Sequence, residues 1–354
     1  MKRPTITDVA RSAGVSKATV SAVLNEKPSV RASTRERVLG VIEALNYRPS
    51  SAGPRAGGAA RGGRTIGLLI KEMDNPYYAE IAVGVGSYCR SRGYQLLVAS
   101  SEGEAAAEKE AIERLREQEV SGLLIMPVLD EDTDLSHLFE LKRRNFPFVL
   151  LEQIRGVRAS LVDVENVEAS RGAVEYLFSL GHTRIVHFAG PRYSMHSEER
   201  IDGVRRAFSR SSLRLGEEAI HPVGAHLEEG YRAGLEYFGT VGEKERATAV
   251  TCYNDLVALG LCRALGELGL KVPEEVSVVG FDDLAMLPYM GVALTTVHVP
   301  KAEMGERAAE MLVRRIESPH ALPPERVTFE GKLVLRGSTA RAAGRAVAVP
   351  ARSG

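Results

Sequence analysis

Three polar side chains follow apolar segments that have the length of buried strands. Asp282 and Asn254 each lie shortly after such a segment, and Arg200 lies on the first turn of the helix predicted after a third. The segments are Val276–Gly280, Thr248–Cys252 and Ile185–Ala189. Ligands of open α/β sheets bind at the carboxyl ends of the strands. A carboxylate, an amide and a guanidinium at that edge suit hydroxyls, a carboxylate or a heterocycle edge, and Arg200 can alternatively pair with Asp282.

The sequence lacks the motifs on which common enzyme classes depend. It contains no G-x-G-x-x-G, no phosphate-binding loop, no G-x-S-x-G elbow and no H-E-x-x-H pair. His182, in G-H-T-R-I, is expected to form hydrogen bonds in a loop and not to bind a metal. We therefore predict a ligand-binding protein that is not an enzyme and that uses no cofactor or metal.

Composition indicates a cytoplasmic protein. The N-terminal residues run into a polar segment and not into the apolar core of a signal peptide, which argues against an exported solute-binding protein. The longest apolar runs are far shorter than the roughly 20 residues of a membrane helix. Cys89, Cys252 and Cys262 are odd in number and lack metal-ligand spacing, so reduced thiols are expected.

The net charge of zero hides an asymmetry along the chain. Residues 1–64 contain 12 Lys and Arg but only 4 Asp and Glu, whereas the remainder contains 34 basic and 42 acidic residues. A small basic head on an acidic body predicts that the head binds a polyanion. A merely solvated basic surface is the alternative.

The body from Thr65 onward alternates short apolar runs with helix-length amphipathic segments. The runs include Ile66–Ile70, Gln95–Ala99, Gly122–Met126 and Phe148–Leu151, and the helical segments include Tyr78–Arg92 and Glu104–Glu117. This alternation predicts parallel sheets covered by helices on both faces. Between head and body, residues 49–64 hold five Gly and two Pro, which is typical of a linker.

The head is predicted to be a helix-turn-helix. Thr5 and Asp8 have capping-box spacing, Gly14 can end the first helix, and Ser16 can cap a second. A third helix is expected to start at the box formed by Ser33 and Glu36. The capped end of the second helix would face phosphates and base edges.

Several longer stretches of the sequence show a specific resemblance to a known protein family. The head reads T-I-T-D-V-A-R-S-A-G-V-S-K-A-T-V-S-A-V-L-N, followed by V-R-A-S-T-R-E-R-V and A-L-N-Y-R-P. The body contains D-N-P-Y-Y-A-E (74–80), Y-N-D-L-V-A-L-G (253–260) and V-P-E-E-V-S-V-V-G-F-D-D (272–283). To about Arg341 the chain resembles the lactose/galactose/purine repressor family. That implies a homodimeric repressor with an all-α helix-turn-helix head and a body of two doubly wound lobes, like periplasmic binding proteins of type I.

The resemblance also implies roles for head residues. Lys17, Ala18 and Ala22 occupy the base-reading positions, and the positions near the DNA backbone are Thr5, Ser16, Thr19, Ser21 and Asn25. In the hinge, the family has an A-R-x-L motif whose leucine wedges into the minor groove, and counting from Pro49 places Arg55 at its third position and Ala56 at the leucine position. Alanines offer only methyl contacts, and the Gly- and Pro-rich hinge disfavours helix. A regulator that binds DNA weakly or non-specifically is therefore the main alternative.

In the body, the resemblance implies an allosteric effector, favoured to be a sugar or sugar-like metabolite, between the lobes. The implied effector-binding residues are Tyr77, Tyr78, Glu152, His196, Arg200, Asn254 and Asp282. Ala225 stands where relatives usually have a stacking aromatic ring, which argues against a planar purine or a stacked pyranose.

The predicted domain boundaries follow from these patterns. A DNA-binding domain covers 1–48, a hinge 49–64, the effector-binding domain 65–340 and a loose tail 341–354. The first lobe is predicted to comprise about 65–163 and 292–324, and the second about 164–291 and 325–340. The helix Tyr78–Arg92 is implied to form much of the dimer contact. The sequence leaves open which effector is bound, which operator is read, and whether the effector releases the protein from DNA or drives it on.

Overall fold

The computed structural model describes residues 5–24, 30–45, 64–129 and 134–342. The chain divides into two compact units, Met1–Gly63 and Arg64–Gly354, which are described separately. Asn25, Arg55 and Ala56 lie outside the described residues, so their predicted contacts with DNA remain predictions.

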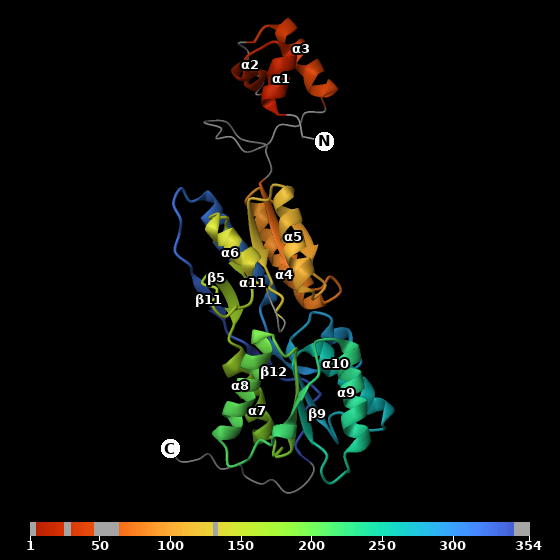
Figure 1. Ribbon diagram of the computed structural model, residues 1–354. Coiled ribbons are helices and arrows are strands. Elements are labelled where there is room, and N and C mark those ends of the chain that lie inside the picture. Colours follow the sequence, from red (N-terminus) through yellow and green to blue (C-terminus); the bar gives the residue numbers. More distant parts are fainter. Residues whose placement is uncertain (1–4, 25–29, 46–63, 130–133, 343–354) are drawn as a thin grey trace. The chain divides into compact units, whose positions relative to one another are not determined.

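Within its described residues, the first unit contains three short helices around a small apolar core (Figure 1). They are α1 (Ile6–Ala13), α2 (Lys17–Leu24) and α3 (Ala32–Ala44). Val9, Val20, Val23 and Val38 are buried at their centre. Gly14 has a φ of 64°, which favours glycine, and it ends α1 as predicted. The predicted helix-turn-helix is confirmed.

Side-chain caps fix the starts of the first two helices. The backbone N–H and the hydroxyl of Thr5 both donate to Asp8, at 2.9 and 2.6 Å. Ser16 Oγ accepts from the backbone N–H of Thr19 at 3.1 Å and so caps α2. The predicted start of α3 is wrong, because the helix begins at Ala32 after Arg31, without a side-chain cap.

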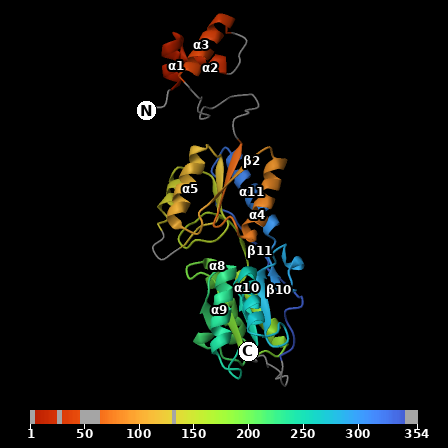
Figure 2. The same ribbon diagram turned by 90° about the vertical axis from the view of Figure 1, so that its right-hand side faces the viewer.

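The second unit contains two six-stranded sheets (Figures 1 and 2). The first has the order β11-β5-β4-β3-β1-β2 and is entirely parallel. Its strands are β1 (Thr65–Ile70), β2 (Gln95–Ser100), β3 (Gly122–Ile125), β4 (Phe148–Leu150), β5 (Ser160–Val164) and β11 (Arg326–Phe329). The second has the order β12-β10-β9-β8-β6-β7, and only β12 is antiparallel to its neighbour. Its strands are β6 (Ile185–Ala189), β7 (Ile220–Pro222), β8 (Ala249–Cys252), β9 (Ser277–Asp282), β10 (Thr295–His298) and β12 (Lys332–Val334).

Helices connect most of the parallel strands and cover both faces of each sheet. They are α4 (Pro76–Ser91), α5 (Ala105–Glu117), α6 (Ser136–Arg143), α7 (Asn166–Ser179), α8 (Met195–Ser209), α9 (Leu227–Thr240), α10 (Asp255–Glu267) and α11 (Lys301–Glu317). Two short 3-10 helices are η1 (Glu217–Ala219) and η2 (Leu287–Tyr289). The predicted fold of two doubly wound lobes is confirmed.

The predicted assignment of the last strands to the lobes is wrong. β10 pairs with β9, so residues 295–298 belong to the second lobe, whereas the prediction placed 292–324 in the first. β11 pairs with β5 and so belongs to the first lobe, although 325–340 was assigned to the second. The chain therefore crosses between the lobes three times, near 164, near 299 and near 330. The pattern of a four-residue strand does not indicate which sheet it will join.

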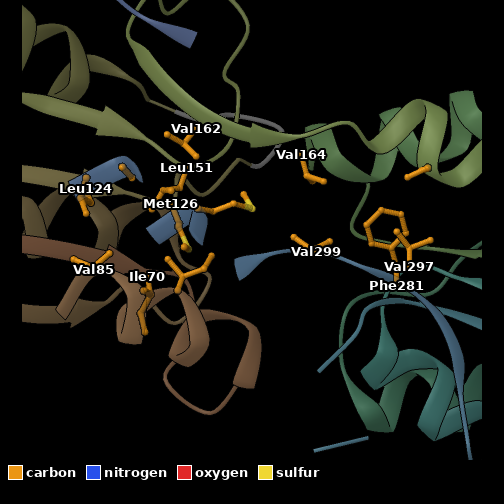
Figure 3. Close-up of a cluster of buried hydrophobic side chains, with 14 of the residues drawn as sticks. Ile70, Val85, Leu124, Met126, Leu151, Val162, Val164, Phe281, Val297 and Val299 are labelled. Atoms are coloured by element: carbon orange, nitrogen blue, oxygen red, sulfur yellow. The ribbon is translucent and has the colours of Figure 1, made fainter. Parts of the chain in front are cut away.

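An apolar core runs continuously through these crossings. Its members include Ile70 and Leu124 in the first lobe and Phe281 and Val297 in the second. Figure 3 shows the two groups of side chains with Val164 and Val299 between them, on the crossing segments. The lobes therefore share one core at the hinge, which restricts their relative motion.

The end of the described chain is bound to the second lobe. The backbone N–H of Ala342 donates to the carbonyl of Leu180 at 3.0 Å, so this part of the predicted loose tail is attached. His182 bonds Thr248 Oγ1 at 2.9 Å and the carbonyl of Ala340 at 3.0 Å. The predicted role of His182 as a hydrogen-bonding loop residue is confirmed.

Candidate functional site

A small cavity between the two lobes gathers all seven predicted effector-binding residues. Its lining consists of Lys71, Asn75, Tyr77, Tyr78, Met126, Leu151, Glu152, His196, Arg200, Ala225, Tyr253, Asn254 and Asp282. Its volume is about 40 Å³. Sites for small molecules usually measure about 300–1,000 Å³, so a ligand of that size can enter only if the lobes separate or side chains move.

The strands place the polar groups at this cavity. Lys71 follows β1, Glu152 lies two residues after β4, Asn254 lies two residues after β8, and Asp282 ends β9. All four strands present their carboxyl ends there, from both sheets. This is the edge at which parallel sheets bind ligands.

Arg200 is the most connected side chain of the cavity. It lies on the second turn of α8, one turn later than predicted, and is 2% exposed. Its Nε donates to Asn166 Oδ1 at 2.9 Å, and Nη1 donates to the carbonyl of Tyr253. The guanidinium carbon lies 3.6 Å from the centroid of the Phe281 ring, and Nη2 lies 3.8 Å from Asp282 Oδ1. Arg200 therefore pairs with Asp282, one of the two roles foreseen, and its orientation is fixed from several sides.

A second buried carboxyl group, that of Asp255, lies behind this pair. Asp255 Oδ1 accepts from Thr296 Oγ1 at 2.6 Å, and Oδ2 accepts from the backbone N–H of Leu284 at 2.9 Å. Burial, and next the charge of Asp282, raise the pKa of Asp255. Burial also raises the pKa of Asp282, against the opposing effect of Arg200. Asp255 thus joins the segment that follows β9 to β10.

Glu152 forms an ion pair with Lys71 in the first lobe and accepts from Ser194 Oγ of the second at 3.0 Å. Burial alone would raise the pKa of Glu152, but Lys71 and His196 lower it to about 2. Burial alone would lower the pKa of Lys71, but Glu152 raises it. Both side chains therefore stay charged at neutral pH.

We expect the Glu152→Gln substitution to flatten the acid dependence of stability. Because the folded pKa lies below the ordinary value, the stability due to ionised Glu152 is present above about pH 4.5 and is lost as pH falls towards 2. The parent protein should lose about 1.4 kcal/mol per pH unit over this range that the variant does not lose. Urea unfolding at pH 3, 4, 5 and 7 measures this, with exposed Glu228→Gln as the control. Equal slopes in parent and variant would contradict the ionised pair.

His196 and Tyr77 bring further polar atoms to the cavity. His196 Nε2 lies 2.8 Å from Asp163 Oδ1, and Asp163 is completely buried at the end of β5. Burial would lower the pKa of His196, but Glu152 and Asp163 raise it. Within the described part of the chain, the hydroxyl of Tyr77 and Asp163 Oδ2 are buried without a hydrogen-bond partner. Such orphaned buried atoms are expected where a ligand supplies the missing partner.

Asn254 and Tyr78 have partly structural roles here. Asn254 Oδ1 accepts from the backbone N–H of Val257 at 2.9 Å and caps α10, and its Nδ2 donates to the carbonyl of Ala225 at 2.8 Å. The rings of Tyr77 and Tyr78 pack edge to face, with centroids 5.4 Å apart. Ala225 lines the cavity with its methyl group, where a larger side chain could have stacked on a ligand.

The sequence prediction missed Lys71, Tyr253 and Asp163. Lys71 and Tyr253 are each the first residue after an apolar strand, at the same carboxyl ends of strands that indicated Asn254 and Asp282. That signal was available in the sequence. The partner of His196, Asp163, lies in the strand β5, which the apolar pattern did not reveal because a carboxylate interrupts it.

A second, larger concavity of about 800 Å³ lies beside β6, β7 and α9. Phe188, His221 and Tyr237 form its aromatic wall, and its rim carries exposed Arg214 and Glu236. It lies on one lobe, whereas the small cavity collects buried charged groups with shifted pKa values from both lobes. Such clusters mark functional sites, so the small cavity is the candidate ligand site.

In the first unit, the predicted DNA-contacting residues that the structure describes lie on α2 or directly before it, except Thr5, which precedes α1. Thr5, Ser16, Lys17 and Ala18 are exposed, and Thr19, Ser21 and Ala22 are half-buried. The hydroxyls of Ser16 and Thr19 lie 2.9 Å apart. Thr19 is therefore tied to the cap as well as being accessible from the solvent.

Two features are absent from the described residues. None of their helices is long and apolar enough to cross a membrane. No group of three or more His, Cys, Asp or Glu in these ranges is arranged to hold a metal ion.

Comparison with known proteins accounts for both units. Residues 5–50 match the model of bacterial regulatory proteins of the lacI family, and residues 174–339 match a periplasmic binding protein-like domain. The HTH-type transcriptional repressor PurR of Photobacterium profundum is 32% identical over 339 residues, which cover 94% of this chain and 98% of the relative. The chain belongs to the lacI family. It is a DNA-binding transcription regulator with an effector-binding domain.

Two solved structures of this family have the same fold as the regulator. The complex of the transcriptional regulator CelR with cellobiose is 31% identical, with a TM-score of 0.70, and the match covers 95% of this chain and 100% of that one. The lac repressor dimer bound to operator and the anti-inducer ONPF is 27% identical, with a TM-score of 0.69 and coverage of 96% and 100%. The family consists of dimeric proteins that bind DNA operators and small-molecule effectors.

Proposed function

We propose that the cavity between the lobes binds a neutral, hydroxyl-rich small molecule of the sugar class, and that this binding changes the affinity of the regulator for its operator. The observation that carries the proposal is the convergence of polar side chains from both lobes at strand ends. A DNA-bound regulator also acts on the chromosome, so we place it in the cytoplasm.

The charges of the cavity favour a neutral ligand. Lys71 is paired with Glu152, Arg200 with Asp282 and His196 with Asp163. An anionic ligand would find each cation already neutralised by a carboxylate. Hydroxyl groups, which both donate and accept, can instead bond the outer edges of these pairs and the free hydroxyl of Tyr77.

The shape of the cavity is also consistent with a sugar and not with a stacked planar ring. Ala225 provides only a methyl group on the wall where relatives stack an aromatic ring. The cellobiose complex of CelR shows that a protein of this fold, 31% identical to this chain, holds a sugar.

A sugar panel tests this proposal directly. Isothermal titration calorimetry with ribose, glucose and cellobiose, and with hypoxanthine as a planar comparison, is expected to detect binding of a sugar only. The Tyr77→Phe variant removes one hydroxyl without changing packing, and should weaken that binding. Binding of hypoxanthine alone would contradict the proposed ligand class.

We further propose that α2 contacts the operator through Ser16, Lys17, Ala18, Thr19, Ser21 and Ala22, together with Thr5. Two alanines at base-reading positions leave Lys17 as the charged reading side chain. An operator with half-sites about one helical turn apart is the geometry that a two-fold dimer reads. The coupling between effector and operator is expected to change affinity by about 5–150-fold.

We expect Lys17→Ala to weaken operator binding by about 5–150-fold, the value of one good base or phosphate contact. The operator is first selected from a random DNA pool with full-length protein. Fluorescence anisotropy then compares the variant with Lys109→Ala, an exposed lysine of the body, which should bind as the parent does. If the pool yields no enriched palindrome with a folded dimer, the reading helix has lost specificity, and the weak-binding alternative is correct.

A further inference from the structure

A polar contact joins the two lobes beside the cavity. Glu72 belongs to the first lobe, between β1 and α4, and His226 precedes α9 in the second. Glu72 Oε1 lies 3.0 Å from His226 Nε2. Asn75 and Ala225, which neighbour this pair, both line the cavity. The contact therefore lies at the rim of the cavity and exists only while the lobes are together.

Both ring nitrogens of His226 face carboxylate oxygens. Nδ1 lies 3.0 Å from Glu229 Oε2, on the first turn of the same helix. An ionised carboxylate only accepts hydrogen bonds, and a neutral imidazole has one N–H to donate. Both bonds can form together only when the imidazole is protonated. The geometry thus makes the contact between the lobes dependent on a proton.

The surroundings reinforce this dependence. Burial would lower the pKa of His226, but Glu72 and then Glu229 raise it. These two carboxylates are the charged groups that act on the imidazole, one from each lobe. Asn75 Nδ2 donates to Glu72 Oε2 at 3.2 Å and holds the carboxylate in place. Glu229 Oε2 also accepts from the backbone N–H groups of Ala225 and His226, at 2.7 and 2.9 Å.

We propose that His226 and Glu72 form a proton-dependent latch that positions the two lobes for effector binding. This inference rests on the proposed function of the cavity. Because the closed arrangement binds the proton more tightly than the open one, the latch is fully formed below the ordinary histidine pKa. It is lost as pH rises through the raised pKa. Effector affinity should therefore be higher at pH 6 than at pH 9.

Other contacts between the lobes do not involve His226. Ser194 donates to Glu152, the backbone N–H of Ala285 donates to Glu80 at 2.9 Å, and Arg155 pairs with Glu198. These need no histidine. His196, which faces Asp163 across the lobes, is a second titratable histidine, so the experiment must separate its effect from that of the latch.

Lobe separation can be measured without knowing the effector. The native cysteines are buried, so dyes attached to exposed Glu113→Cys and Glu274→Cys report on the lobes by single-molecule energy transfer. In full-length parent protein, the ratio of closed to open molecules should fall about two- to fivefold from pH 6 to pH 9, as for an exposed ion pair. His226→Asn keeps a good helix cap but should lose this titration, and Glu72→Gln should shift it to lower pH. His320→Asn is the matched control, and circular dichroism checks that each variant is folded.

The outcomes of these experiments distinguish a failure of the latch hypothesis from a failure of the proposed ligand class. If His226→Asn titrates as the parent does, the latch is wrong and His196 is the responsible group. A ratio that is constant with pH in the parent also overturns it. Addition of cellobiose or ribose at pH 6 tests the ligand class separately: absence of any response, with the titration intact, would refute the sugar and leave the latch standing.

Discussion

Replacing Arg200 with methionine is expected to lower the free energy of unfolding by about 3 kcal/mol and to abolish effector binding. Loss of one partner of a buried ion pair costs about 3–5 kcal/mol, and Arg200 is 2% exposed beside Asp282. The lower end applies because the pKa of Asp282 is already raised by burial, so this carboxyl can take up a proton when Arg200 is removed. The loss of stability should also increase with pH. Without Arg200, keeping the buried Asp282 carboxyl protonated costs less free energy at pH 6 than at pH 8. Urea unfolding at both values should show the larger loss at pH 8.

Arg263→Met is the matched control for this substitution. Arg263 also stacks on a tyrosine, with its guanidinium carbon 4.5 Å from the Tyr231 ring centroid, but its side chain is 67% exposed. Exposed pairs of this kind contribute about 0.2–1 kcal/mol. If the two variants lose similar stability, with no difference between pH 6 and pH 8, Arg200 does not hold a buried charge.

Gly84→Ala is expected to be the most damaging change to packing in the first lobe. A Cβ at this position in α4 would lie 1.9 Å from the carbonyl oxygen of Ala302 in α11. A backbone oxygen cannot rotate away, so the two helices must separate. Overpacking of a core costs about 1–3 kcal/mol and sometimes more, and we expect about 3 kcal/mol here. Because α4 begins beside the cavity, effector affinity should fall as well.

Gly86→Ala, two residues further along the same helix, should have the opposite effect on stability. Its Cβ would meet Leu96 Cδ2 at 3.7 Å, an ordinary contact. Alanine is preferred over glycine in a helix by about 1 kcal/mol, so this variant should be as stable as the parent or slightly more stable. Thermal unfolding of both variants at one protein concentration makes the comparison. Equal stability of Gly84→Ala and the parent would show that the helices do not approach as closely as described.

Much of the candidate site followed from position alone. Asp282 and Asn254 lie at or shortly after the ends of apolar strands, and parallel strands bring their carboxyl ends to one edge, so their presence at the cavity could be predicted. Lys71 and Tyr253 follow the same rule, so their presence at the cavity could also be predicted from the sequence. Asn254, however, uses both polar atoms of its side chain within the protein, which no local pattern indicates.

The sequence alone determined the alternation of apolar strands with helices in the body and the helix-turn-helix with its Thr5 and Ser16 caps. These depend on short-range periodicity and on residues a few positions apart. The start of α3 was misplaced because Ser33 and Glu36 have capping-box spacing but lie inside the helix, which begins at Ala32 without a side-chain cap. Tertiary structure decided which sheet β10 and β11 join, and which partners Arg200, His196 and His226 find. Those partners lie from 33 to 154 positions away in the chain, and only the folded arrangement of both lobes determines distances across such separations.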